Sequence, residues 1–61
     1  MNGFYAVVVS ALKAVGFFYV RQKGSHQTWS NGKLSVTVST NCESRHTANS
    51  IMKQAGLRQR F

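Results

Sequence analysis

Acidic side chains are almost absent from this 61-residue sequence, which contains one Glu, Glu43, and no Asp. A single carboxylate excludes a two-carboxylate catalytic pair, a two-metal nuclease site and a complete Ser-His-Asp triad. Cysteine is equally scarce, since Cys42 stands alone and can close no disulfide within the chain. Together with His26 and His46 it falls short of the four ligands of a closed structural zinc site. We therefore expect a protein without metal or other cofactor.

Proline is missing, and so are long apolar runs. No run approaches the roughly 18 residues that span a membrane. The apolar run at residues 5–9 has no basic segment before it of the kind that begins a secretory signal. We expect a cytoplasmic, bacterial protein that does not enter a membrane. The 43% apolar and 11% aromatic content is typical of a folded chain, and the length fits one domain over residues 1–61 with a thin stability margin.

The positive charge is high for this size. Eight Lys and Arg residues against one Glu give a formal charge of +7. Such a surface indicates a polyanionic partner, most commonly nucleic acid. An anionic membrane would favour cations gathered along one amphipathic helix, whereas here they are spread over at least four segments. An acidic protein remains an alternative partner for the same surface.

Hydrophobic periodicity predicts two helices, over residues 4–15 and 48–55. Gly16 and Gly56 follow them as C-terminal stops, and Thr47 is expected to cap the second helix. Leu57 can fold back on the end of that helix, which leaves a short basic tail up to Phe61.

Between the helices the pattern predicts three strands, over residues 17–22, 26–30 and 33–38. Residues 23–25 form the first turn, and Asn31-Gly32 is a strong hairpin signal for the second. The order is α-β-β-β-α. Three antiparallel strands with two helices over one face make a two-layer α+β fold.

Side-chain alternation along the second strand places a histidine on the open face of this sheet. If Trp29 points into the core, so does Gln27, while His26 faces away from the helices. His26 would then lie beside the turn and near Arg21. Histidine can accept or donate a proton near neutral pH. RNA carries its own nucleophile, the 2′-hydroxyl, so this minimal chemistry favours RNA over DNA.

Each of these residues also has a simpler interpretation. A lone histidine in a small domain is most often solvated or structural, and this applies to His26 and more strongly to His46. Trp29 is expected in the core, whereas Tyr19, which shares strand parity with Arg21, could be exposed and stack on an unpaired base. Cys42 is expected to be an incidental loop thiol. A noncatalytic RNA-binding module satisfies the charge and the fold equally well.

Several motifs resemble the HicA (YcfA-like) toxin family. They are VRQKGSH at residues 20–26, the Asn31-Gly32 hairpin, VTV at 36–38 and IMKQAGL at 51–57, so the similarity runs from about residue 7 to residue 57. The resemblance implies a fold like that of double-stranded-RNA-binding domains, with both helices on one sheet face. It also implies a ribosome-independent mRNA interferase that is neutralised by a HicB antitoxin encoded beside it. The family's catalytic histidine maps onto His26, preceded by Gly24 and Ser25.

The sequence departs from the family pattern at three places. Gln27 stands where members often have a second histidine, Ser39 follows Val38 where Val-Pro is usual, and residues 42–47 replace a loop that often carries Lys, Glu and Gly-Thr. The third departure changes the residues with which that loop would contact substrate and partner.

These features give a specific hypothesis, a metal-independent endoribonuclease with His26 as its single catalytic histidine. Arg21 and Lys23 would hold the scissile phosphate, and Ser25 or a backbone N–H beside Gly24 would donate to it. Arg45, just before the second helix, would contact another phosphate. The second acid or base is left open between Lys23 and His46. The expected partners are single-stranded mRNA and a HicB-like antitoxin, with the free toxin a monomer and the neutralised form a hetero-oligomer.

Overall fold

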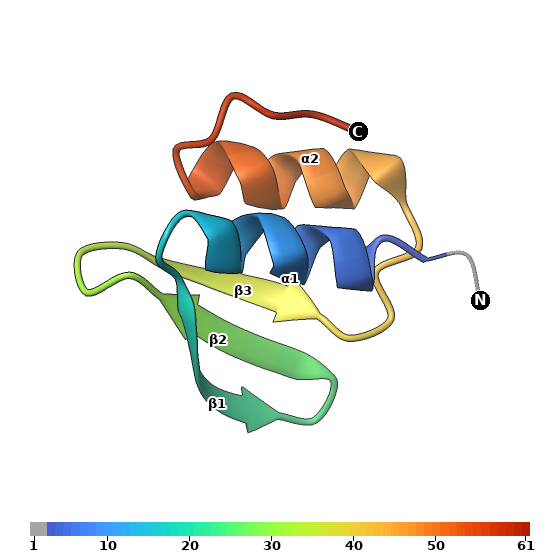
Figure 1. Ribbon diagram of the computed structural model, residues 1–61. Helices are drawn as coiled ribbons and strands as arrows, with labels where there is room; N and C mark the ends of the chain where they lie inside the picture. The colour runs from blue at the N-terminus through green and yellow to red at the C-terminus, as the bar shows by residue number, and fades with distance from the viewer. Residues whose placement is uncertain (1–2) are drawn as a thin grey trace.

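The computed structural model describes residues 3–61 as two helices and three strands in the order α-β-β-β-α, as the sequence predicts (Figure 1). The elements are α1 (Tyr5–Ala14), β1 (Phe18–Lys23), β2 (His26–Ser30), β3 (Ser35–Ser39) and α2 (Arg45–Gln54). The α+β class is confirmed.

Helix α1 forms because its apolar residues recur at helical spacing and bury one side. Val8 and Leu12 are fully buried. The helix ends in a Schellman motif, in which the Gly16 N–H donates to the Lys13 carbonyl (3.1 Å) and the Phe17 N–H to the Leu12 carbonyl (3.0 Å). Gly16 adopts φ +94°, a conformation that disfavours residues with a Cβ, so its predicted role as a stop is confirmed.

Helix α2 begins earlier than the sequence predicts. Ser44, not Thr47, is the N-cap: its hydroxyl accepts a hydrogen bond from the Thr47 N–H at 3.4 Å. The prediction of Thr47 as the cap is therefore wrong, because the serine three residues earlier satisfies the free N–H of the first turn. The buried side of α2 and its C-cap consists of Ala48, Ile51, Met52 and Ala55, at the helical spacing that the sequence pattern indicates.

The three strands form one antiparallel sheet in the order β1-β2-β3. Gly24-Ser25 is a two-residue turn between β1 and β2. The second hairpin is confirmed, but its loop spans residues 31–34, so β3 begins two residues later than predicted. The reason is local: the Asn31 side-chain oxygen accepts from the N–H groups of Lys33 (2.9 Å) and Leu34 (2.8 Å), which keeps both out of the ladder.

Strand β1 contains a bulge that the sequence does not announce. Tyr19 pairs with Trp29 and Arg21 pairs with Thr28, so the register shifts at Val20. One extra residue reverses the side-chain alternation along the strand. Tyr19 therefore lies on the helix side of the sheet and Arg21 on the open side, and the prediction that they share a face is wrong.

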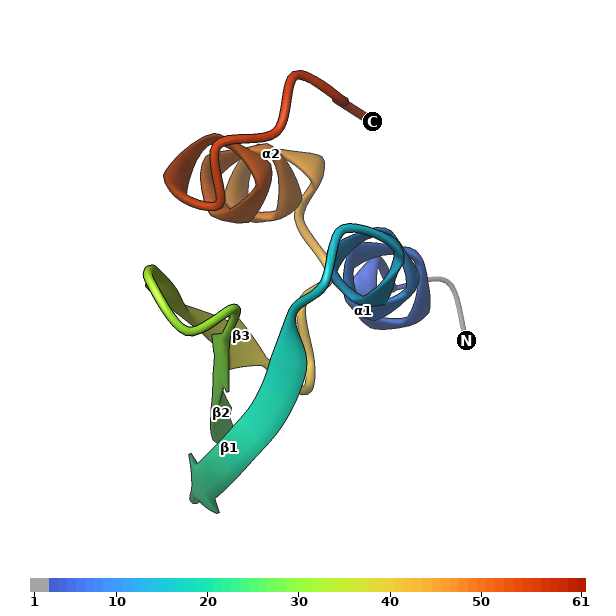
Figure 2. The ribbon, with the colours of Figure 1, turned by 60° about the vertical axis from the view of Figure 1, so that its left-hand side comes forward.

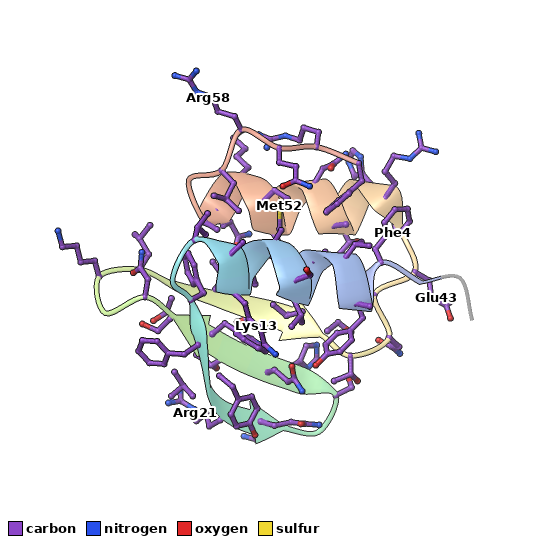
Figure 3. The ribbon with its side chains drawn as sticks, viewed as in Figure 1. Phe4, Lys13, Arg21, Glu43, Met52 and Arg58 are labelled. Carbon is purple, nitrogen blue, oxygen red and sulfur yellow. The ribbon has the colours of Figure 1, made fainter. Side chains whose placement is uncertain are left out.

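The core lies between one sheet face and the two helices (Figure 2). Trp29, Val36 and Val38 alternate along β2 and β3 toward this core, and Met52 points from α2 into it (Figure 3). The residues between them are exposed or half-buried on the opposite face. The two-layer architecture with both helices on one face is confirmed.

Two segments outside the regular elements complete the core. Cys42 is only 3% exposed, so its expected role as an incidental loop thiol is wrong. Burial raises the pKa of the thiol. Leu57 folds back on α2 as expected, with its N–H donating to the Met52 carbonyl. Phe61 packs its ring 5.9 Å from that of Phe4, which fixes the C-terminal tail.

This core predicts a sharp difference between two leucines. Leu12→Ala should lower the free energy of unfolding by about 2–5 kcal/mol, because Leu12 is fully buried and the deletion leaves a cavity. Leu34→Ala should change it by less than about 0.5 kcal/mol, since Leu34 is 45% exposed. Urea denaturation followed by Trp29 fluorescence measures both, and equal losses would contradict the placement of the core.

Candidate functional site

The β1–β2 hairpin carries His26 on the open face of the sheet. His26 is the first residue of β2 and is exposed. The sheet register places it between Lys23 on β1 and Ser39 on β3. Paired residues in an antiparallel sheet project to the same side, with Cβ atoms about 4.5–5.5 Å apart. A titratable imidazole therefore lies between a cation and a hydroxyl, at the edge of an uncovered surface.

Arg21 lies on the same face, one row further along the sheet. It pairs with Thr28, which in turn pairs with Thr37. Arg21 and Lys23 are two residues apart on β1, so strand alternation places both on the side of His26, and the bulge at Val20 instead changes the sides of Phe18 and Tyr19. Two cations of β1 thus lie near the histidine on this face: Lys23 directly opposite it and Arg21 one row away.

The turn before His26 is held on both sides. Gly24 adopts φ +62°, a left-handed conformation that favours glycine. Its carbonyl accepts a hydrogen bond from the Gln22 side-chain amide at 2.8 Å. The Ser25 carbonyl accepts from the Thr40 N–H, also at 2.8 Å. The position of His26 is therefore fixed from β1 and from the residue that follows β3.

Gln27 is the centre of a buried hydrogen-bond network on the opposite face. Its side-chain oxygen accepts from the Tyr5 hydroxyl (2.7 Å) and from the Trp29 indole N–H (3.0 Å). Its amide donates to the Gln22 side-chain oxygen at 3.2 Å, and Gln22 then donates to Gly24. A continuous chain of hydrogen bonds thus links α1 to the turn that carries His26. Within residues 3–61, no buried side-chain nitrogen or oxygen lacks a partner.

The burial of Gln27 clarifies its difference from the family pattern. Residue 27 points toward the helices, whereas His26 points away from them. A side chain at position 27 reaches His26 only through the backbone and the Gln22–Gly24 contact. Gln27 is therefore a residue that supports the turn from behind.

The other predicted residues are not gathered at the hairpin. Arg45 is the first residue of α2, and His46 is the second; both are exposed. The expectation that they precede the helix is wrong, because Ser44 starts it earlier. Figure 1 shows α2 beginning at the same end of the molecule as the β1–β2 turn, but in the helical layer. Lys23 is the titratable group that the register places opposite His26.

Tyr19 forms part of an aromatic cluster on the helix side instead of a stacking site beside Arg21. Its ring meets Trp29 edge-on, with centroids 6.1 Å apart and an interplanar angle of 86°. The Lys13 ammonium group lies 5.9 Å from the Trp29 ring centroid. Figure 3 shows Lys13 on α1 and Arg21 on β1. Lys13 contacts the helix side of the sheet at Trp29, whereas Arg21 pairs with Thr28 on the open side. Trp29 is 4% exposed, so its predicted core position is confirmed.

Sequence reasoning assigned none of the hydroxyl side chains around His26 to the site, although strand alternation placed Thr28 on the same face as His26. Thr28, Thr37 and Ser39 share its face. The alternation of Val36 and Val38 with polar residues was a signal that these hydroxyls face outward. Their alignment with His26 depends on the register of β3, which no residue pattern specified.

Across residues 3–61, no three His, Cys, Asp or Glu side chains gather in a way that could hold a metal ion. Over the same range, neither helix has the length and apolar character needed to cross a bilayer.

An α-β-β-β-α fold with a cationic hairpin and an open polar sheet face defines a small basic α+β protein suited to contact a polyanion. Comparison with known protein families gives a more specific classification than the fold does. A protein-family model described as the HicA toxin of bacterial toxin–antitoxin systems matches residues 5–57. The chain belongs to this family of type II toxins, whose members are generally ribonucleases. The family implies an antitoxin partner. No curated protein and no solved structure matches the chain.

The network behind the turn predicts a measurable role for Gln27. Gln27→Leu should lower the free energy of unfolding by about 1–3 kcal/mol, because the buried Trp29 N–H loses its acceptor. Gln22→Ala should cost less than about 0.5 kcal/mol, since Gln22 is exposed and water can replace it. Urea denaturation and the hydrogen exchange of the Trp29 indole N–H report the two effects. Unchanged stability and unchanged exchange in Gln27→Leu would show that the network contributes nothing.

Proposed function

We propose that the protein acts in its toxin–antitoxin system as a metal-independent endoribonuclease. It cleaves mRNA without the ribosome and so inhibits translation and growth. The observation that carries this proposal is the exposed His26 between Lys23 and Ser39, on a turn held from both sides. Family membership supports it, because HicA toxins are generally ribonucleases.

His26 supplies the proton transfer. Its imidazole accepts the proton of a ribose 2′-hydroxyl, and the freed oxygen attacks the adjacent phosphorus in line. The bond from phosphorus to the 5′-oxygen breaks as the bond to the 2′-oxygen forms. The products are a 2′,3′-cyclic phosphate and a 5′-hydroxyl, and the leaving oxygen takes up one proton. No step requires a metal ion or a carboxylate.

The cations position the substrate and offset its charge. Lys23 lies opposite His26, and Arg21 lies one row away, so both can hold the phosphate that is attacked. The Ser25 hydroxyl or a backbone N–H beside Gly24 donates to a phosphate oxygen. Arg45, at the N-terminus of α2, contacts a phosphate further along the RNA.

The second proton transfer falls to Lys23 in this arrangement, since His46 lies on α2. A lysine is a weak proton donor to an alkoxide compared with a second imidazole near neutral pH. We therefore expect slow turnover, which a toxin that arrests growth can tolerate.

The central prediction concerns His26. With EDTA present, wild-type protein should cleave a long single-stranded RNA, and His26→Ala should be at least about 100-fold slower, because general acid–base catalysis contributes a factor of this order or more. An all-deoxy strand of the same sequence should stay intact, since it lacks the nucleophile. Gel electrophoresis of the products measures all three rates.

His46→Ala is the matched control, because it makes the same change on a different element. It should retain activity within a fewfold of wild type. Cleavage at the wild-type rate by a refolded His26→Ala variant would contradict the mechanism. Binding of RNA by both proteins without cleavage would replace it with the alternative, a noncatalytic RNA-binding module.

The antitoxin proposal has its own test. We propose that the free toxin is a monomer and that an acidic, HicB-like protein forms a hetero-oligomer with it and covers His26, since the toxin is strongly basic and belongs to a toxin–antitoxin family. The antitoxin should abolish RNA cleavage at equimolar concentration and change the chemical shifts of the His26 ring in NMR spectra. Its affinity should fall with rising salt. A tight complex that cleaves RNA at the free rate would contradict this placement.

A further inference from the structure

The open face of the sheet is organised in three cross-strand rows. The sheet register defines them as Lys23–His26–Ser39, Arg21–Thr28–Thr37 and Phe18–Ser30–Ser35. None of these side chains is buried, and none belongs to the core. The face is therefore a surface of hydroxyls with a histidine at one end and an aromatic ring at the other.

Phe18 is the exceptional member of this surface. It is 53% exposed, and the register places it beside Ser30 instead of against the helices. The bulge at Val20 is the cause: in a regular strand, Phe18 and Arg21 would point to opposite sides. An exposed aromatic ring on a hydroxyl-rich sheet face offers a flat surface for stacking.

The charges on this face are all positive. Arg21 and Lys23 lie on it, between Phe18 and the His26 end. The one acidic residue of the sequence, Glu43, instead lines a cavity of about 300 Å³ with Tyr5 and Cys42, beside the start of α1. The face thus complements a polyanion and contains no carboxylate that would repel one.

The spacing of the rows suits an extended chain. Phe18 pairs with Ser30, four residues along β2 from His26, which corresponds to about 13 Å at the usual rise per residue. A strand that presents a phosphate at His26 therefore reaches Phe18 with a nearby nucleotide. Bases inside a duplex are already stacked on their neighbours and cannot offer a face to Phe18.

We propose that single-stranded RNA lies across this open sheet face, with its phosphates at Lys23 and Arg21 and an unpaired base stacked on Phe18. The inference rests on the proposed function for the position of the scissile phosphate. It deepens that function by making Phe18 a substrate-positioning residue and unpaired RNA the required substrate. It also assigns the stacking role to Phe18, because Tyr19 is on the other side of the sheet against Trp29.

Binding to a short fluorescent single-stranded RNA tests this without cleavage, in the His26→Ala background. Adding Phe18→Ala should weaken binding about five- to 150-fold, the usual effect of removing one stacking partner. Phe18→Trp should restore it. The slope of log affinity against log salt should not change with Phe18→Ala, whereas Arg21→Gln should reduce it by about 0.7, since one phosphate contact is lost.

Tyr19→Ala is the matched control, an adjacent aromatic of similar exposure on the opposite face. Once circular dichroism shows that it is folded, it should bind RNA as tightly as its parent. A 2-aminopurine base placed at successive positions of the RNA should show quenching that depends on Phe18 at one position.

The outcomes separate this inference from the proposed function. Equal RNA affinity with and without Phe18, or equal affinity for duplex and single strand, would overturn the inference even if the wild type cleaves RNA. Lost affinity for the antitoxin alone in Phe18→Ala would also overturn it, in favour of a protein-binding role. Wild type that binds through Phe18 but never cleaves would support the RNA path and reject the nuclease.

Discussion

The register between β1 and β2 is the constraint on which the rest of the structure depends. The two-residue Gly24-Ser25 turn sets the pairing of residues 21–23 with β2, and the bulge at Val20 shifts the pairing of Phe18 and Tyr19 by one residue. Without the turn, His26 would not face Lys23; without the bulge, Phe18 and Arg21 would lie on different faces. A shift of one residue would also place Trp29 in solvent, so the hydrophobic core and the open face select the same register.

Gln27 couples these two faces. A buried amide is costly unless its hydrogen bonds are made, and Gln27 makes three, to Tyr5, Trp29 and Gln22. An apolar residue would fill the same space without holding Gln22 against the Gly24 carbonyl. The network therefore orients the turn in addition to satisfying the buried Trp29 N–H. The departure of residue 27 from the family pattern thus concerns the support of His26 and not the face on which the chemistry is proposed.

The sequence was sufficient for the element order, the outward direction of His26 and the helix stops at Gly16 and Gly56, because alternation and glycine conformation are local properties. It was insufficient where two local solutions compete or where a contact is nonlocal. Ser44 and Thr47 are both good caps, and only the path of the chain after β3 selects Ser44. The bulge at Val20 has no residue signature. Cys42 is buried by long-range packing against the core, which a polar loop sequence does not indicate.

The division of labour between the two sheet faces explains how so small a chain can carry this charge. The helices bury one face, and the core there is apolar except for the satisfied Gln27. The cations of β1 are left on the other face or at its rim, where water screens their mutual repulsion. A polyanion that occupies this face would remove the remaining repulsion and gain the released counterions. On the proposed function, RNA and an acidic antitoxin both bind this surface because each reduces the repulsion between its cations. The antitoxin therefore neutralises the toxin by competing with RNA, and no change in the fold of the toxin is required.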